Sequence, residues 1–224
     1  MNKAPLFHAL DVFFYKGFSL RSRAVRVLTS IRYGVPFRKC LSHVAVGYDS
    51  RSTISAEATG AKIILNSEIE NSKSDVVVYR FVNLSRVNIT SFREVLEQKL
   101  GIKYAYARYG LDAARIFSFV SGVLGLLFGW ISLKMALGFV ALLVLLQVAS
   151  HLLRKVDNRT SDCAELTAMI LGDLRLLSYL PNPRNEFPNS QLSKMETLEW
   201  HGLASKINVW NYKSKTWRED TNGK

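Results

Sequence analysis

The chain has few cysteines and no cysteine–histidine spacing typical of a metal cluster. Among its 224 residues there are two cysteines, Cys40 and Cys163, too few for a disulfide framework or a zinc site built from cysteine pairs. The N-terminus does not resemble a secretory signal peptide, because Asp11 and Lys16 interrupt a short apolar stretch. We therefore expect a protein of a reducing compartment that uses no metal and no cofactor.

Motifs for binding nucleotides or nucleic acids are also missing. The sequence has no glycine-rich phosphate loop, no zinc-knuckle spacing and no aromatic RNA-binding signature. Its net charge of +12, from 30 basic and 18 acidic residues, nevertheless favours an anionic partner such as nucleic acid or an anionic membrane surface. A basic surface without a dedicated partner is the alternative. Because no motif supports nucleic acid, we expect no nucleic-acid partner.

The N-terminal segment 1–35 is basic and alternates cationic with apolar residues. This pattern predicts an amphipathic helix with a basic face, which either packs on the core or contacts lipid. With 48% hydrophobic residues, the chain is long enough for one domain with a core and an additional element.

Segment 36–115 is predicted to hold the sheet. Short β-rich stretches at 42–48, 53–65 and 75–82 are separated by turn residues, which favours antiparallel strands joined by tight turns. A capping box at 91–94 predicts the start of a helix that ends at Gly101.

Segment 116–150 is strongly apolar, with Lys134 as its single charged residue from 117 to 150. One straight helix of this length would measure roughly 50 Å, whereas the hydrocarbon core of a bilayer is about 30 Å thick. We therefore expect two helices, at 116–131 and 133–148, forming an apolar membrane hairpin with its tip at 132–134. A buried pair of core helices is the alternative.

Basic residues flank this segment on both sides. Lys103, Arg108 and Arg115 precede it, and Arg154, Lys155 and Arg159 follow it. Positive charge favours the cytoplasmic side, so we expect a membrane-associated protein in which the segments before and after the apolar insertion lie on the cytoplasmic face.

The last segment, 151–224, contains the candidate nucleophile. Cys163 lies in the first turn of a predicted helix that presents Leu166, Ile170 and Leu174 on the same face. The unpaired N–H groups at a helix N-terminus favour a thiolate. A single cysteine on an apolar helix face is, however, more often simply buried.

His43 is the candidate base, because a strand would hold its ring rigidly. His8, His151 and His201 are more typical of bystanders. A hairpin can return Glu57 to the side of His43, which gives the base-and-orienter arrangement of a triad. A solvated strand carboxylate is the alternative for Glu57.

Five segments in this order carry a family resemblance: 42–46, 57–63, 101–104, 162–166 and 187–192. Together they resemble the circularly permuted NlpC-type branch of papain-like cysteine hydrolases, the YiiX-like group, to which lecithin retinol acyltransferase is related. In this branch the histidine strand precedes the cysteine helix. The departures are the long apolar insertion and Phe187 in place of a threonine.

The resemblance implies an α+β papain-like fold, with an antiparallel sheet packed on the nucleophile-bearing helix. It implies that Cys163 attacks a carbonyl carbon to give a thioester acyl-enzyme, that His43 is the base and that Glu57 orients it. It also implies that Tyr104 lines the substrate site. The expected function is hydrolysis of an amide, ester or thioester; the alternatives are an acyltransferase and an inactive membrane adaptor. The expected partners are membrane lipid and an acyl-, amide- or peptide-containing substrate.

Overall fold

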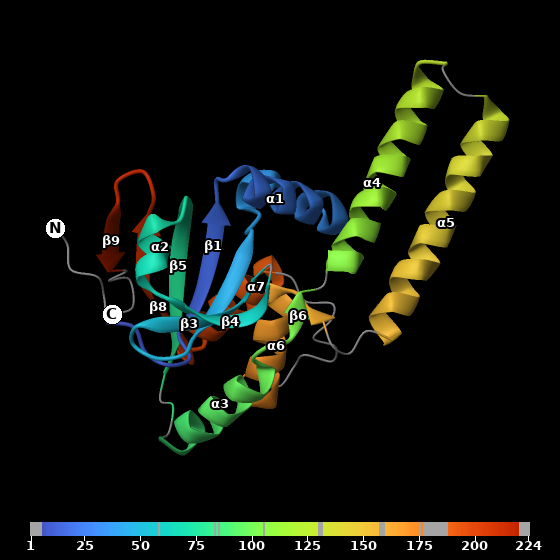
Figure 1. The fold of residues 1–224 in the computed structure, drawn as a ribbon. Coiled ribbons are helices and arrows are strands. Elements are labelled where there is room, and N and C mark those ends of the chain that lie inside the picture. Colours follow the sequence, from blue (N-terminus) through green and yellow to red (C-terminus); the bar gives the residue numbers. More distant parts are fainter. Residues whose placement is uncertain are drawn as a thin grey trace. The chain divides into compact units, whose positions relative to one another are not determined.

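The computed structural model describes residues 6–57, 59–82, 84, 86–104, 106–129, 132–156, 160–174, 176 and 188–219. Phe187 and Arg159, which entered the sequence-based expectations, lie outside these ranges. The chain divides into two compact units, one formed by residues 1–104 with 161–224 and the other by residues 105–160. Figure 1 shows a mixed α+β architecture in which the first unit contains the sheet.

The sheet has seven antiparallel strands in the order β4-β3-β2-β1-β5-β8-β9. Its strands are β1 Val12–Gly17, β2 His43–Gly47, β3 Ser52–Glu57, β4 Gly60–Leu65, β5 Ser74–Phe81, β8 Ala204–Asn211 and β9 Thr216–Glu219. The prediction of an antiparallel sheet is confirmed. A second, two-stranded sheet pairs β6 Lys103–Tyr104 with β7 Thr160–Ser161.

The central strand β1 was not predicted, because the basic and apolar alternation of segment 1–35 favoured a helix throughout. The helix of this segment, α1, covers only Leu20–Tyr33. The run Val12-Phe13-Phe14 is fully buried on both faces of the sheet, which is typical of a central strand and not of an amphipathic helix.

Two apolar cores cover the two faces of the sheet. One contains Phe14, Val44 and Leu166, and helices α3 Arg86–Lys99, α6 Cys163–Asp173 and α7 Pro188–Trp200 contribute to it. The other contains Phe13 and Trp210, together with Ile69 of the short helix α2 Ser67–Asn71. Side chains alternate along β1, so neighbouring phenylalanines serve different cores.

The N-terminal end of α6 is defined by its cap. The carboxylate of Asp162 accepts a hydrogen bond of 2.8 Å from the N–H of Glu165, which is the usual arrangement of an N-cap aspartate. Leu166 and Ile170 are 1% and 0% exposed, and Leu174 packs partly buried against the same core. The predicted apolar face of this helix is therefore present. α3, by contrast, begins at Arg86, ahead of the predicted capping box at 91–94.

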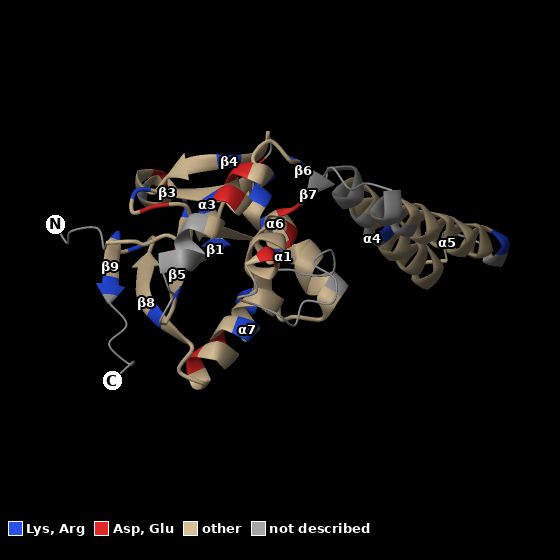
Figure 2. Cartoon of the chain, turned by 90° about the horizontal axis from the view of Figure 1, so that it is seen from below, with Lys and Arg blue, Asp and Glu red and all other residues tan. Residues whose placement is uncertain are grey.

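Positive charge is spread over many elements. Figure 2 shows basic residues on β4, β8, β9 and α7. On α1, the predicted basic face is not wholly solvated: Arg26 is 4% exposed and donates hydrogen bonds to the carbonyl oxygens of Gly17 and Phe37. Part of the charge assigned to a partner-binding face therefore has a structural role.

The second unit is a pair of helices, α4 Tyr106–Leu127 and α5 Leu133–Val156, which pack against each other. The expected tip at 132–134 is displaced, because α4 ends at Leu127 and Lys134 lies in the first turn of α5. Several large apolar side chains of both helices are exposed, among them Phe117, Leu127 and Leu145.

The expectation of a membrane-spanning hairpin is wrong. Within the described ranges, no helix combines the length and the apolar character that a membrane crossing requires. The apolar run is divided between two helices, of which the first contains Arg115 and the second begins with Leu133 and Lys134. The membrane-associated, cytoplasmic-face localisation, which depended on this hairpin, loses its basis.

Candidate active site

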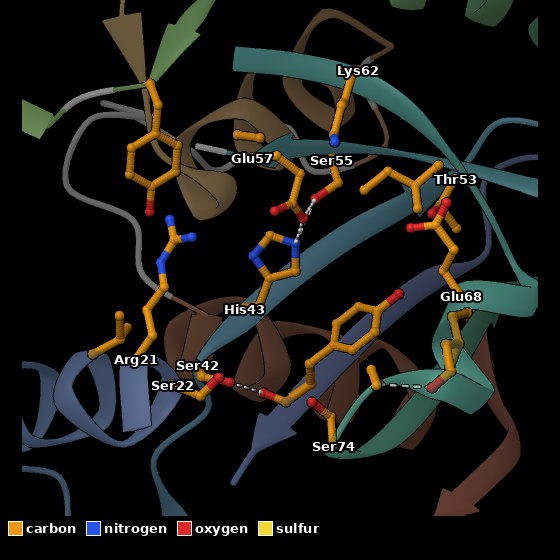
Figure 3. A pocket seen from close by; sticks show the side chains of 17 residues that line it. Arg21, Ser22, Ser42, His43, Thr53, Ser55, Glu57, Lys62, Glu68 and Ser74 are labelled. Carbon is orange, nitrogen blue, oxygen red and sulfur yellow. Dashed lines mark hydrogen bonds and ion pairs between the residues drawn. The ribbon is translucent and has the colours of Figure 1, made fainter. Parts of the chain in front are cut away.

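A pocket of about 320 Å³ opens in the first unit beside strands β1 to β4. His43, Glu57 and Tyr104, three of the four residues singled out from the sequence, line it (Figure 3). About half of its lining residues carry a hydroxyl group: Tyr15, Ser22, Ser42, Thr53, Ser55, Ser72, Ser74 and Tyr104. The pocket is therefore rich in hydrogen-bonding groups.

Strand register explains why His43 and Glu57 lie together. β2 pairs with β3 through Val46↔Ile54 and Gly47↔Thr53. Continuing the same register places Glu57 opposite His43, where side chains of an antiparallel pair approach closely. The atoms His43 Nε2 and Glu57 Oε1 are 3.6 Å apart.

Ser55 lies between these two side chains and was not foreseen from the sequence. Its Oγ is 2.5 Å from His43 Nε2 and donates a hydrogen bond of 3.2 Å to Glu57 Oε1 (Figure 3). The sequence did contain a signal for Ser55, because residues two apart on a strand share a face. Ser55 precedes Glu57 by two positions, so any strand that points Glu57 at His43 also points Ser55 there.

Charge and burial around His43 favour its neutral form. Burial lowers the pKa of His43 below its ordinary value, and the cationic Arg21 lowers it further, whereas Glu57 raises it. Figure 3 shows Arg21 reaching from α1 into the pocket, on the side of the imidazole away from Ser55. A neutral imidazole is the form that can act as a base.

We expect this lowered pKa to make stability depend on pH. Below about pH 6.5, the ordinary pKa of histidine, His43 of the unfolded chain takes up a proton before His43 of the folded chain does. The free energy of unfolding therefore falls as the pH drops towards the lowered pKa. Urea unfolding of the wild type and of His43→Gln between pH 5 and 8 measures this effect.

The difference in the free energy of unfolding between the wild type and His43→Gln isolates the contribution of His43, because the carboxylates that also titrate in acid are the same in both proteins. The stability of the wild type relative to His43→Gln is expected to decrease as the pH falls below 6.5. A difference that stays constant or increases would show that the environment of His43 does not disfavour its charged form.

Cys163 is the first residue of α6 and is 3% exposed. The backbone N–H groups of Val44 and Ala164 lie close enough to its sulfur to lower the pKa of the thiol. The sulfur therefore lies near the peptide bond that joins His43 to Val44, where α6 packs on β2 and β3.

The thiol is in its protonated form in this conformation. Burial raises the pKa of Cys163, and the negative charges of Asp162 and Glu57 raise it further, while the nearby backbone N–H groups of Val44 and Ala164 lower it. The expectation that the helix N-terminus favours a thiolate omitted both burial and the cap, since the carboxylate of Asp162 already occupies the positive end of the helix.

Cys163 is not among the residues that line the pocket. It belongs to the core that contains Val44, whereas His43 faces the pocket, in line with the alternation of side chains along β2. The structure thus brings His43, Glu57 and Tyr104 together and places the sulfur against the backbone behind them.

Tyr15 is a further pocket residue that sequence analysis missed, because β1 itself was missed. Its ring centroid is 5.3 Å from that of His43, and burial raises its pKa. Tyr15 is therefore an uncharged side chain that lines the pocket.

In the part of the chain that the structure describes, no three His, Cys, Asp or Glu side chains are grouped so as to hold a metal ion. No family model matches the chain, and no curated protein is significantly similar to it. The fold and the site thus describe an α+β domain with a polar pocket, in which Ser55 connects the side chains of His43 and Glu57.

Proposed function

We propose that the protein is a papain-like cysteine hydrolase of permuted order, in which Cys163 is the nucleophile and His43 the base. One observation carries the proposal: Cys163 lies in the same buried core as Val44, the residue that follows His43, and the backbone N–H of Val44 is close enough to lower the pKa of the Cys163 thiol. The packing of α6 on β2 and β3 supports it as well, since a sheet packed on the nucleophile helix is the expected arrangement.

In the proposed reaction, His43 removes the proton of the Cys163 thiol, and the sulfur attacks the carbonyl carbon of an amide, ester or thioester. The tetrahedral intermediate collapses as His43 protonates the leaving group, which gives a thioester between Cys163 and the acyl group. Water, deprotonated by His43, then releases the acid and restores the thiol.

This reaction requires the sulfur to leave its buried position. With Cys163 3% exposed, rotation or a shift of the first turn of α6 must bring the sulfur to the pocket. The reactive form is therefore a minor conformation of the free protein.

The pocket favours a polar acyl donor over a long hydrocarbon chain. Its hydroxyl groups and the charged side chains of Arg21, Lys62 and Glu68 can form hydrogen bonds with a polar ligand or with water, whereas an apolar chain that displaced the water would leave them unpaired at a cost of about 1–3 kcal/mol each. We propose a small amide, ester or thioester whose acyl part carries polar groups.

A binding function without thiol chemistry is the second candidate. The observation that favours it is the combination of a buried Cys163, a raised thiol pKa and a polar pocket without the sulfur in its lining. In that case the pocket binds a polar ligand, and Cys163 is a packing residue.

Alkylation of Cys163 by iodoacetamide at different pH values separates the two candidates. In a Cys40→Ser background, a hydrolase is expected to react at Cys163 with a midpoint below the free-thiol value of about 8.5. His43→Ala is expected to slow the reaction at pH 7 about tenfold or more, because the imidazole no longer stabilises the thiolate. The rate is measured by mass spectrometry of the peptide that contains Cys163.

His201→Ala is the matched control, since His201 follows α7 in an exposed turn, and it is expected to leave the rate unchanged. A midpoint at or above 8.5 together with no effect of His43→Ala would reject the hydrolase and leave the binding function.

A further inference from the structure

The hydrogen bonds around Ser55 determine where its single proton lies. An ionised carboxylate only accepts hydrogen bonds, so the Ser55 hydroxyl donates to Glu57 Oε1, at 3.2 Å. The Ser55 oxygen, 2.5 Å from His43 Nε2, must then accept the proton on that nitrogen. His43 is therefore protonated at Nε2, and its lone pair lies on Nδ1.

Glu57 does not reach His43 by a hydrogen bond of its own. The 3.6 Å between Glu57 Oε1 and His43 Nε2 exceeds the usual range of about 2.7–3.2 Å. Ser55 bridges this gap, and it is 2% exposed, so bulk water does not compete for its hydroxyl. Ser55 therefore provides the hydrogen-bonded connection between His43 and Glu57.

We propose that Ser55 is a positioning residue that couples Glu57 to His43, holding the imidazole in its Nε2–H form and leaving Nδ1 as the basic atom. The catalytic consequence rests on the proposed function, whereas the state of the imidazole does not depend on Cys163.

The assignment specifies the proton transfer of the proposed reaction. Nδ1 takes the proton of the Cys163 thiol, so the S–H bond breaks and an Nδ1–H bond forms. The Nε2 proton stays directed at Ser55, and the Ser55 proton stays directed at Glu57. The imidazolium is then stabilised by the carboxylate through the hydroxyl, and no proton passes along the chain.

Other charged and titratable groups also face this imidazole. Arg21 approaches from α1, Tyr15 from β1 and Lys62 from β4, and Cys163 lies behind β2. A serine variant leaves all of them in place, so a change in His43 between wild type and variant reports the contact with Ser55.

The test is ¹⁵N NMR of the histidine side chains in the full chain, with His43 assigned by comparison with His43→Gln. In the wild type at pH 8, His43 is expected as a single neutral form with the proton on Nε2. Ser55→Ala is expected to give a mixture of the Nε2–H and Nδ1–H forms, and Ser55→Thr, which keeps the hydroxyl, is expected to restore the single form.

Ser72→Ala is the matched control: Ser72 lines the same pocket but donates to the carbonyl of Ile69, so the wild-type spectrum is expected. Two results overturn the proposal, namely a wild-type His43 protonated on Nδ1 and a Ser55→Ala variant that keeps the single Nε2–H form. The wild-type spectrum decides even if Ser55→Ala does not fold.

Failure of this proposal is distinguishable from failure of the proposed function. If the thiol of Cys163 proves ordinary while His43 carries its proton on Nε2, the serine contact stands and the hydrolase does not. If the thiol is activated by His43 but Ser55→Ala leaves the imidazole unchanged, the hydrolase stands and the serine contact does not.

Discussion

Replacing Leu166 by alanine is expected to lower the free energy of unfolding by about 2–5 kcal/mol, because the change leaves a cavity in the core beneath α6. Leu166 is 1% exposed and packs in the same core as Val44 and Cys163. Urea unfolding followed by circular dichroism measures the loss. The N-terminal turn of α6 is expected to loosen as well, so Cys163 in a Cys40→Ser background should be alkylated faster.

Leu65→Ala is the control for this prediction. Leu65 is at the end of β4 and 57% exposed, and substitutions of exposed side chains usually change stability by no more than about 0.5 kcal/mol. A loss below 1 kcal/mol for Leu166→Ala would mean that α6 is not held on the sheet by this core, which would remove the support for placing Cys163 beside His43.

The second large effect is expected at Asp11, whose side chain is completely buried. Its carboxylate accepts hydrogen bonds of 2.8 and 2.7 Å from Arg80 and one of 2.7 Å from the N–H of His8. Asp11→Ala leaves the guanidinium and the amide without these partners, which typically costs about 3–5 kcal/mol for a buried pair. Because Arg80 is 27% exposed, the lower end of this range is expected.

A double-mutant cycle with Arg80→Met measures the coupling directly. The double variant is expected to be more stable than Asp11→Ala alone, since the unpaired charge is gone. Asp173→Ala is the control: its ion pair with Lys99 is 2.8 Å long but lies at the surface, so a loss below about 1 kcal/mol is expected. Equal losses for the two aspartates would contradict the structural role assigned to Asp11.

The elements that could be predicted from the sequence are those whose local pattern and final environment agree. The β-branched stretch of β5 and the turn residues between β2 and β3 favour locally the same structure that they adopt in the sheet. β1 could not be predicted in this way. Its run of phenylalanines is short and lies next to a basic helix, and only the burial of both faces distinguishes it from the first turns of that helix.

The proximity of His43 to Glu57 could be predicted from the sequence, but the burial of Cys163 could not. Spacing along a hairpin is sufficient to place His43 near Glu57, since register follows from the turn between the strands. The burial of Cys163 depends on how closely α6 packs on β2 and β3, and this distance is set by the side chains of the other elements that share the same core. No local pattern around Cys163 contains that information.

The pairing of β6 with β7 holds the two ends of the inserted segment side by side. The two strands pair directly and so lie about 4.8 Å apart, which means that the segment between them leaves and re-enters the first unit at neighbouring points. The entropy of closing such a loop increases only with the logarithm of its length. The sheet domain therefore tolerates an excursion of almost any length at this point, and the helix pair is an appendage whose size the domain does not constrain.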